Sequence, residues 1–398
     1  MKDLNFTEIL PPELITEILL RVPVKSLLKF RSVSKFWLTL ISSGEFIKNH
    51  LSLSANNKED THHVLIFGQS RYYKGNFKEC LFRSLFNDSV TEAFDLKYPI
   101  EDNCKLFNVL GSCNGLIFLA EYLECCSLLW NPTTRMHKNL PDIRPRWKKY
   151  YVEYGFGYDE LRDDYKVLGI FYNRCGLDGG EVKIYSLKSD SWTSVDYIGE
   201  EILNTSDSIR KMRLAYSGFF VNGKLHWDTI TSGPNPGDVC RCRHIIYFDL
   251  ANEKWEKVEK SSYGVGETDL YMGTLGSDLC VFRDYNETQL GVWVMNGYGV
   301  KESWIKKFTI TYPIKQVLYP PLFMSNNGEM LATLGTITSI MYNSKDDAFR
   351  YPHVINCNDF HGVTIYVESL VCPFSTEVTE KAKKQRGKKL RSKPLRNK

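Results

Sequence analysis

VKIYSLKSDSW at residues 182–192 and IIYFDLANEKW at residues 245–255 are two copies of one pattern. In each copy, a short run of strand-forming residues ends at an aromatic residue, a polar turn follows, and a Trp comes a few residues later. β-branched and aromatic residues favour strands, and polar clusters between such runs favour turns. The pattern therefore predicts two short strands joined by a turn.

Degenerate copies of this unit extend along most of the chain. They lie at residues 81–94, 127–141, 291–304 and 340–352. The anchor residues are about 44 to 63 positions apart, which is the spacing of repeated blades in a propeller. These anchors are Phe86, Trp130, Tyr185, Phe248, Met295 and Tyr342.

A second element with a Gly-type turn precedes most copies. Examples are SCNGLIFLA at 112–120, FVNGKLHW at 220–227, LGSDLCVF at 275–282 and SNNGEMLATL at 325–334. Asn-Gly between strand formers is a strong hairpin signal. Together the two elements predict a β-propeller of about six blades, in which the recurrent Trp fill the space between neighbouring sheets. Packed β-sandwiches are the alternative, which explains the strands but not the single repeated unit.

The N-terminal region has a different period. Residues 10–41 read LPPELITEILLRVPVKSLLKFRSVSKFWLTLI. Leu14, Ile18 and Val22 repeat every four residues, and Pro23 ends this first helix. Apolar residues then continue to Ile41, so we expect a small helical unit.

This helical unit contains more apolar side chains than it can bury alone. Seventeen lie between Leu10 and Ile41, and a unit of this size is marginally stable by itself. One interpretation is a partner protein whose groove accepts an apolar helical face. The other is that the helices cap the downstream domain, and the pattern alone leaves both open.

Composition indicates a globular protein of a reducing compartment. Of 398 residues, 43% are hydrophobic, which is enough for a core, and eleven Cys at irregular spacing indicate reduced thiols. The chain has no run of about 18 apolar residues that would predict a membrane span, and MKDLNFTEIL lacks a secretion signal. We therefore expect a protein of the cytoplasm and nucleus.

The net charge of +4 is unevenly distributed. Residues 381–398 hold ten Lys and Arg and no acid, which leaves 41 basic against 47 acidic residues in 1–380. A mildly acidic body argues against nucleic-acid binding. The basic segment predicts a disordered tail over 376–398, serving either nuclear import or only solubility.

The helical segment resembles the F-box over about 40 residues, with Pro12 as a departure from the motif. The resemblance rests on Leu10-Pro11, Leu14, Glu17-Ile18-Leu19, Pro23-Val24-Lys25-Ser26-Leu27, Phe30-Arg31, Val33-Ser34-Lys35 and Trp37. It implies docking to a Skp-type adaptor, which in turn binds a cullin. The implied adaptor contacts are Leu10, Pro11, Leu14, Ile18, Val24, Leu27, Val33 and Lys35, and Trp37 is assigned to internal packing.

The following region resembles the F-box-associated domain of plant kelch-like and S-locus F-box proteins. The resembling pieces include Gly111-Ser112-Cys113-Asn114-Gly115-Leu116, Trp130-Asn131-Pro132-Thr133, Asn222-Gly223-Lys224-Leu225-His226-Trp227 and Tyr366-Val367-Glu368-Ser369-Leu370. We expect an F-box at 1–52 and a substrate-binding propeller at 60–375. The resemblance implies a non-catalytic receptor of a ubiquitin ligase that binds a target for degradation. A scaffold that holds the adaptor without a cullin is the alternative.

Candidate chemistry elsewhere is weak, so we expect no catalysis, no metal and no cofactor. Cys240, Cys242 and His244 are spaced too closely for a usual zinc site and lack a second pair of ligands. The irregular loops at 141–151, 206–213 and 232–243 carry Arg and aromatic residues, which are enriched in interfaces. We therefore predict target contacts there, although Trp147 has an equal claim to packing within a blade. The predicted contacts are Arg144, Arg146, Trp147, Arg210 and Arg241.

Overall fold

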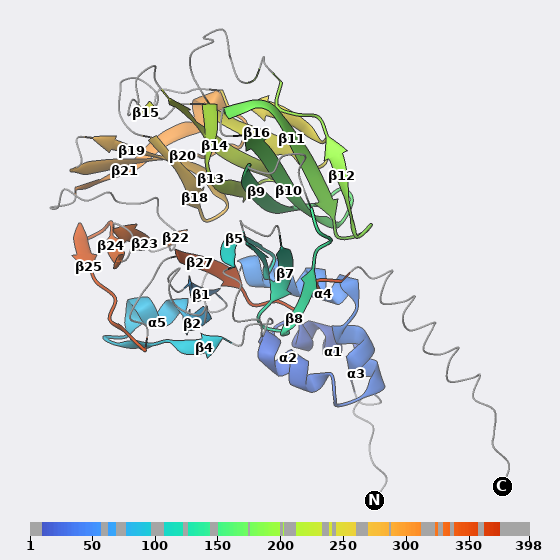
Figure 1. The fold of residues 1–398 in the computed structure, drawn as a ribbon. Coiled ribbons are helices and arrows are strands. Elements are labelled where there is room, and N and C mark those ends of the chain that lie inside the picture. Colours follow the sequence, from blue (N-terminus) through green and yellow to red (C-terminus); the bar gives the residue numbers. More distant parts are fainter. Residues whose placement is uncertain are drawn as a thin grey trace, which may run out of the picture.

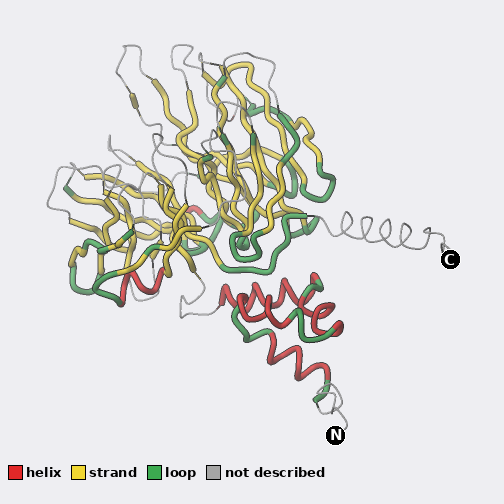
Figure 2. Tube along the Cα trace, turned by 60° about the horizontal axis from the view of Figure 1, so that its bottom comes forward, coloured by secondary structure: helices red, strands yellow, loops and turns green. Residues whose placement is uncertain are grey.

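A computed structural model shows four N-terminal helices below a large strand-rich body (Figure 1). The same division is visible from a second direction, where the helices pack at one side of the strands (Figure 2). The structure describes residues 10–56, 63–68, 77–96, 107–121, 126–143, 150–173, 176–199, 202, 212–232, 239–240, 244–259, 270–285, 288–311, 323–324, 329–334, 338–356 and 362–374.

The helices begin where the local sequence predicts. They are α1 (Pro12–Leu19), α2 (Val24–Phe30), α3 (Lys35–Ile41) and α4 (Gly44–Asn56). Pro12 occupies the first position of α1, where its missing N–H costs nothing, and Pro23 precedes α2. Ser34 caps α3, because its side-chain oxygen accepts a hydrogen bond from the N–H of Trp37 at 3.1 Å. The predicted helical unit is confirmed and continues through α4.

The strands follow one another as antiparallel meanders. In the first part of the body they are β1 (His63–Gly68), β2 (Phe77–Leu81), β3 (Thr91–Glu92), β4 (Phe94–Leu96), β5 (Asn108–Cys113), β6 (Leu116–Ala120), β7 (Ser127–Asn131), β8 (Met136–Asn139), β9 (Tyr151–Asp159), β10 (Asp164–Asn173), β11 (Gly176–Ser186) and β12 (Ser191–Val195). They continue as β13 (Met212–Val221), β14 (Lys224–Ser232), β15 (Val239–Cys240), β16 (Ile245–Asp249), β17 (Lys254–Lys257), β18 (Leu270–Leu275), β19 (Asp278–Tyr285), β20 (Gln289–Met295), β21 (Trp304–Thr311), β22 (Phe323–Met324), β23 (Glu329–Leu334), β24 (Thr338–Asn343), β25 (Ala348–Arg350), β26 (Val354–Ile355) and β27 (Gly362–Val367). A 3-10 helix, η3 (Lys301–Ser303), lies between β20 and β21.

The described strands form four-stranded sheets in the orders β5-β6-β7-β8, β18-β19-β20-β21, β22-β23-β24-β25 and β27-β1-β2-β4. In a nine-stranded sheet, two further meanders, β9 to β12 and β13 to β17, meet where β9 and β13 pair in parallel at Gly155 and Gly218. The last strand, β27, pairs with the first, β1, and so joins the two ends of the body. This is the strand order expected of a propeller. The number of blades stays a prediction.

The repeated unit has a clear local structure. Its turns end in a residue with positive φ at Arg135, Asp190, Glu253 and Asp347. In two of these turns the first residue, an Asn, stabilises the turn conformation. Asn131 Oδ1 accepts the N–H of Thr133 at 2.9 Å, and Asn343 Oδ1 accepts the N–H of Lys345 at 3.0 Å. The two arms carry paired rings, as in Tyr185 and Trp192, whose centroids are 5.4 Å apart.

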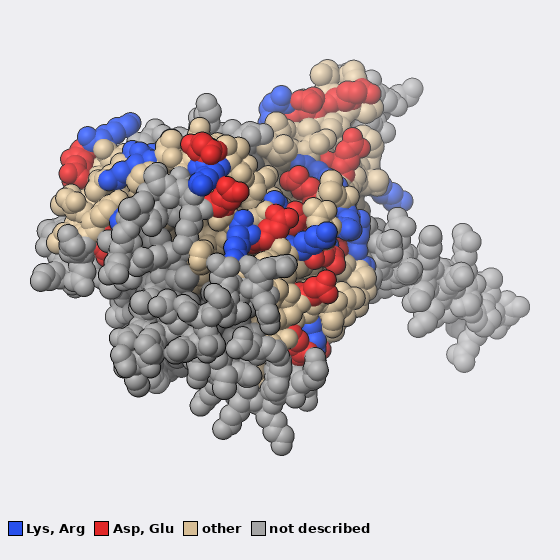
Figure 3. Space-filling view, turned by 90° about the horizontal axis from the view of Figure 1, so that it is seen from above, with Lys and Arg blue, Asp and Glu red and all other residues tan. Residues whose placement is uncertain are grey.

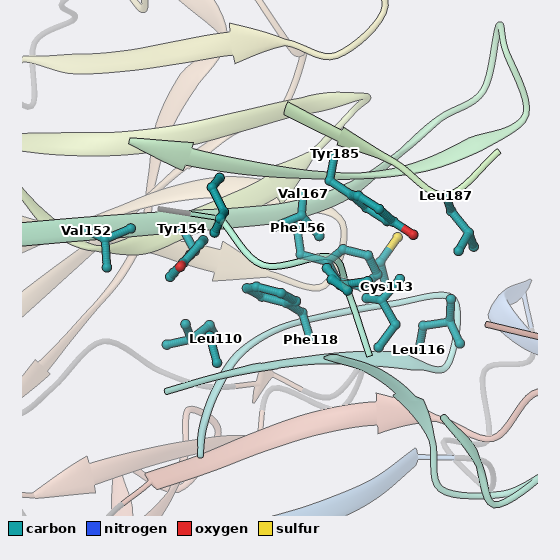
Figure 4. Packing of buried hydrophobic residues seen from close by; sticks show 14 of the residues in the cluster. Leu110, Cys113, Leu116, Phe118, Val152, Tyr154, Phe156, Val167, Tyr185 and Leu187 are labelled. Carbon is teal, nitrogen blue, oxygen red and sulfur yellow. The ribbon is translucent and has the colours of Figure 1, made fainter. Parts of the chain in front are cut away.

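The Trp of the repeat reach the neighbouring sheet, as expected. Trp192 Nε1 donates to the carbonyl of Pro141 at 2.8 Å, and Trp255 Nε1 donates to the carbonyl of Asp196 at 3.1 Å. Between the β5–β8 sheet and the β9–β12 meander, Phe118 meets Tyr154 at a centroid distance of 5.3 Å (Figure 4). These side chains hold successive sheets together.

One expected copy is wrong. Residues 81–94 do not form the strand unit, because α5 (Phe82–Asn87) occupies its first half. The apolar residues Phe82, Leu85 and Phe86 are spaced by three and four, which suits one helical face, and the rings of Phe82 and Phe86 lie 4.8 Å apart.

Candidate functional site

The helical unit exposes part of the face that the sequence assigned to an adaptor. Leu14 and Ile18 of α1 are 50% and 55% exposed, and Val33, before α3, is 61% exposed. Pro11 and Lys35 are exposed as well. Large apolar side chains at this exposure commonly mark a protein-binding surface.

Two residues of the predicted adaptor set need correction. Val24 and Leu27 are both 0% exposed, so their side chains cannot contact a partner in this arrangement. They belong instead to a core cluster that includes Leu370, from the far end of the chain. Leu10 is half-buried in the same cluster. Trp37 packs edge-on against Phe30 with ring centroids 5.5 Å apart, which fits its expected internal role.

Within residues 10–41, two exposed large apolar residues were absent from the predicted set. Phe36 and Leu38 of α3 lie on the surface of the helical unit. Their signal in the sequence was the surplus of apolar residues in this segment, but the pattern could not show which of them face outward. We call Leu14, Ile18, Val33, Phe36 and Leu38 the exposed helical set.

The other side of the helical unit is covered by the strand body. Lys48 Nζ of α4 lies 2.8 Å from a carboxylate oxygen of Asp163, in the turn after β9. Ile47 and Leu51 of α4 pack against the cluster between the β5–β8 sheet and the β9–β12 meander. The helices therefore cap the downstream domain with one face, while other apolar side chains of the same unit stay exposed, and the partner interpretation of these stays a prediction.

The five predicted target contacts lie outside the described residues. Arg144, Arg146 and Trp147 precede β9, Arg210 precedes β13, and Arg241 precedes β16. β9, β13 and β16 each begin next to a predicted contact and end at a short turn that faces the helices. The turn after β9 contains Asp163, the partner of Lys48. The flanking strands thus begin at the face away from the helices.

The described part of that far face carries no large area of one charge. Acidic and basic side chains are interspersed over it (Figure 3). A partner of mixed charge suits such a surface better than a polyanion, whose binding needs clustered Lys and Arg.

Burial shifts the pKa of two titratable groups in the strand body by a large amount. Burial raises the pKa of Glu153 on β9 to about 8 and lowers the pKa of His226 on β14 to about 4. His226 Nε2 lies 2.7 Å from the hydroxyl of Tyr298, and Glu153 Oε1 lies 3.4 Å from that of Tyr172. These contacts join neighbouring parts of the body.

The described part of the chain shows neither a clustered set of metal ligands nor a helix suited to a membrane span. There, no group of three or more His, Cys, Asp or Glu side chains is arranged to hold a metal ion. None of the helices in these ranges is long and apolar enough to span a membrane. Of the cysteine and histidine cluster considered above, Cys242 lies outside the described residues.

Comparison with known families fits both halves of this architecture. Residues 8–49 match the F-box domain, and residues 76–372 match the F-box associated beta propeller domain. The chain belongs to the F-box-associated β-propeller family. The predicted propeller and the predicted family are thereby confirmed, and the packed-sandwich alternative is set aside.

Relatives share this organisation across almost their whole length. The chain is 28% identical to an F-box/kelch-repeat protein of Arabidopsis thaliana, over 92% of this chain and 96% of that one. It is also 28% identical to the F-box protein CPR1 of the same plant, over 91% and 88%. A chain in the nidogen/laminin crystal structure aligns with a TM-score of 0.45 at 9% identity, over 77% of this chain and 99% of that one.

The pairing of these two domains is that of a substrate receptor in a Skp–cullin–F-box ligase. An F-box implies binding of a Skp-type adaptor, and members of this kind are typically non-catalytic.

Proposed function

We propose that this protein is the substrate-recognition subunit of a Skp–cullin–F-box ubiquitin ligase, which binds a target protein for ubiquitylation and proteasomal degradation. One observation carries the proposal: the helical unit keeps large apolar side chains in water on one face while its other face is fixed to the propeller. Exposed apolar side chains grouped in one small unit are typical of a protein-interaction site.

The exposed helical set supplies the adaptor contact. Fully burying a Leu or Ile side chain contributes roughly 1.5–3 kcal/mol, so a few such residues support a stable complex. Lys35 and Pro11 lie beside this set in sequence and remain in the proposed contact. Val24 and Leu27 are withdrawn, because the chain uses them internally.

The propeller supplies the target contact at the face away from the helices. Arg144, Arg146, Trp147, Arg210 and Arg241 remain the proposed contacts there. The receptor then acts by proximity, holding the target's acceptor lysine at high effective concentration near the conjugating enzyme. No step of the transfer chemistry is assigned to its own residues.

Adaptor binding tests the helical half of the proposal. The Leu14→Asp/Ile18→Asp double variant should bind a purified Skp-type adaptor at least ~100-fold more weakly, because two apolar contacts are lost and two charges are introduced. Leu53→Asp is the matched control, since Leu53 is 47% exposed in the same unit but lies beyond the residues that match the F-box. Equal affinity in all three proteins contradicts the proposal.

Cullin recovery separates the receptor from the scaffold alternative. A receptor purified from cells should bring down both the adaptor and a cullin, and the amount of cullin should fall with the adaptor in the double variant. A chain that retains the adaptor without any cullin is a scaffold.

We also propose that the protein works in the cytoplasm and nucleus. The ten basic residues of 381–398 support nuclear import. Deleting them should lower the nuclear fraction seen by microscopy, and an unchanged distribution assigns the tail no role in import.

A further inference from the structure

An irregular segment, residues 368–374, lies between the helices and the propeller, and we call it the strap. Segments without regular structure normally run over the surface, because their backbone polar groups need water or a protein partner. Here Glu368, Ser369, Leu370 and Val371 are all buried. The strap must therefore be held from both sides.

On the helical side, the strap completes a core. Leu370 is buried in the cluster formed by residues such as Leu19, Val24 and Leu27. The carboxylate of Glu368 lies 3.0 Å from Lys25 Nζ. Burial alone would lower the pKa of Lys25, but its hydrogen bond to Glu368 raises that pKa above the ordinary value. The helices thus depend on a side chain that lies some 350 positions away in sequence.

On the propeller side, one amide holds the strap. Asn131, which is fully buried at the end of β7, donates through Nδ2 to the carbonyls of Ser369 at 3.1 Å and Val371 at 2.8 Å, and to the hydroxyl of Ser369 at 3.2 Å. Its Oδ1 accepts the N–H of Thr133, so the turn itself orients the amide.

A glycine turn fits against the same place. Gly115 has φ +81°, and a Cβ there would lie 2.2 Å from the hydroxyl oxygen of Ser369. The hairpin between β5 and β6 can therefore lie on the strap only with glycine at this position.

The strap also follows β27 without a gap. β27 pairs with β1 from Gly362↔Gly68 to Val367↔His63, and this pairing joins the last strand of the propeller to the first. The next residue, Glu368, already belongs to the strap. The position of Leu370 in the helical core is thus set by the same pairing that closes the propeller.

We propose that the strap couples closure of the propeller to folding of the F-box helices, so that the adaptor-binding face is presented only by chains whose propeller is complete. The coupling is a folding property of this chain alone. Its consequence for adaptor binding rests on the proposed function.

Hydrogen exchange of the intact chain, without adaptor, tests the coupling. Asn131→Ala changes no residue of the helices, yet it should raise exchange of amides in α1 to α3 by about tenfold or more, because the strap loses its anchor. The matched control is Asn343→Ala. Asn343 opens the equivalent turn after β24 and accepts the N–H of Lys345, but it belongs to a sheet away from the strap.

The comparison between these variants decides the outcome. Faster helical exchange in Asn131→Ala than in Asn343→Ala supports the coupling, and equal helical exchange overturns it. If Asn131→Ala does not fold, Ser369→Ala removes only one acceptor of the Asn131 amide and should give a smaller change in the same helices. The coupling and the proposed function can fail separately. If helical amides exchange faster in Asn131→Ala than in Asn343→Ala but the wild-type protein binds no adaptor, the coupling is retained and the proposed function is rejected.

Discussion

The ammonium of Lys166 joins two meanders of the propeller. It lies 3.0 Å from Asp159 Oδ2 and 3.0 Å from Glu253 Oε1, and it donates to the carbonyl of Leu250 at 2.7 Å. Burial would raise the pKa of Asp159, but hydrogen bonds from Lys166 and Arg162 hold that pKa below its ordinary value. Asp159 is thus a buried carboxylate that depends on its cations.

Removing Lys166 should therefore be costly. We expect Lys166→Ala to lower the free energy of unfolding by about 3–5 kcal/mol, because it removes the buried cation beside a buried carboxylate and leaves only the more exposed Arg162 as a charged partner. Arg162→Ala serves as the control: Arg162 pairs with the same oxygen at 3.0 Å but is mostly exposed, so its loss should cost less than ~1 kcal/mol. Urea unfolding of the two variants measures both losses in the free energy of unfolding. Losses of similar size would contradict the prediction that Lys166 matters more than Arg162.

His226 predicts a pH dependence of stability. Its pKa is about 4 in the folded chain, against an ordinary value of 6.5. Between these values the unfolded chain binds the proton and the folded chain does not, so stability falls as pH falls. From pH 6.5 to pH 5 the contribution of His226 should fall by about 1.5 kcal/mol, while the raised pKa of Glu153 acts in the opposite direction over the same range.

His226→Gln should remove this contribution, because glutamine does not titrate, so the stability of the variant relative to wild type should increase as pH falls from 6.5 to 5. Unfolding midpoints of wild type and variant, measured at steps between pH 6.5 and pH 5, provide the check. Parallel slopes would show that another group carries the dependence.

Residue-level exposure was the least predictable property of the helical site. The pattern correctly marked Leu14 and Ile18 as one apolar row, and both are exposed. It also marked Val24 and Leu27, which are buried in a cluster that includes Leu370. Local periodicity contains no information about contacts with residues so far away in sequence. Sequence reasoning therefore could not separate the exposed members of the predicted adaptor set from the buried ones.

Among the elements, the hairpins were predictable because their signals are local. Asn114-Gly115 and Asn222-Gly223 both adopt positive φ at both positions, as the Asn-Gly signal requires. The parallel contact of β9 with β13 had no such signal. It depends on two glycines in separate strands and on a Trp that covers them.

Because Trp227 covers the contact between β9 and β13, Gly218 should tolerate no side chain. A Cβ on Gly218 would lie 2.4 Å from Cζ2 of the fully buried Trp227. Gly218→Ala should lower stability by roughly 1–3 kcal/mol through overpacking. At Gly297 a Cβ would meet its nearest neighbour at 3.4 Å, so Gly297→Ala should change stability by less than ~0.5 kcal/mol. Thermal unfolding compares the two, and a tolerated Gly218→Ala would mean that Trp227 can move aside.

For the whole molecule, the surface proposed for the adaptor and the face proposed for the target lie at opposite ends of one body. The short turns face the helices, whereas the strands that follow the predicted target contacts begin at the other end (Figure 1). The strap, the ion pair of Lys48 with Asp163 and the packing of α4 fix the helices to the propeller. A target bound at the far end would therefore keep a set orientation relative to the adaptor. Sequence reasoning predicted the two domains and offered a helical cap on the downstream domain as one interpretation. It could not give the contacts of this junction, because they join residues from both ends of the chain.

This junction decides which variant best separates target binding from ubiquitylation. Deleting residues 1–56 removes the adaptor face, but it also uncovers Leu370 and the apolar contacts of α4. We expect the deleted chain to unfold at a clearly lower temperature than wild type and to self-associate in size-exclusion chromatography, since newly exposed apolar patches promote association.

Leu14→Asp/Ile18→Asp changes only exposed positions, so its midpoint should stay within about 2 °C of wild type. If the double variant also retains its target, it should accumulate that target without modifying it, which proximity labelling in cells can detect. A deleted chain as stable and monomeric as wild type would show that the strap and α4 contribute little to the junction.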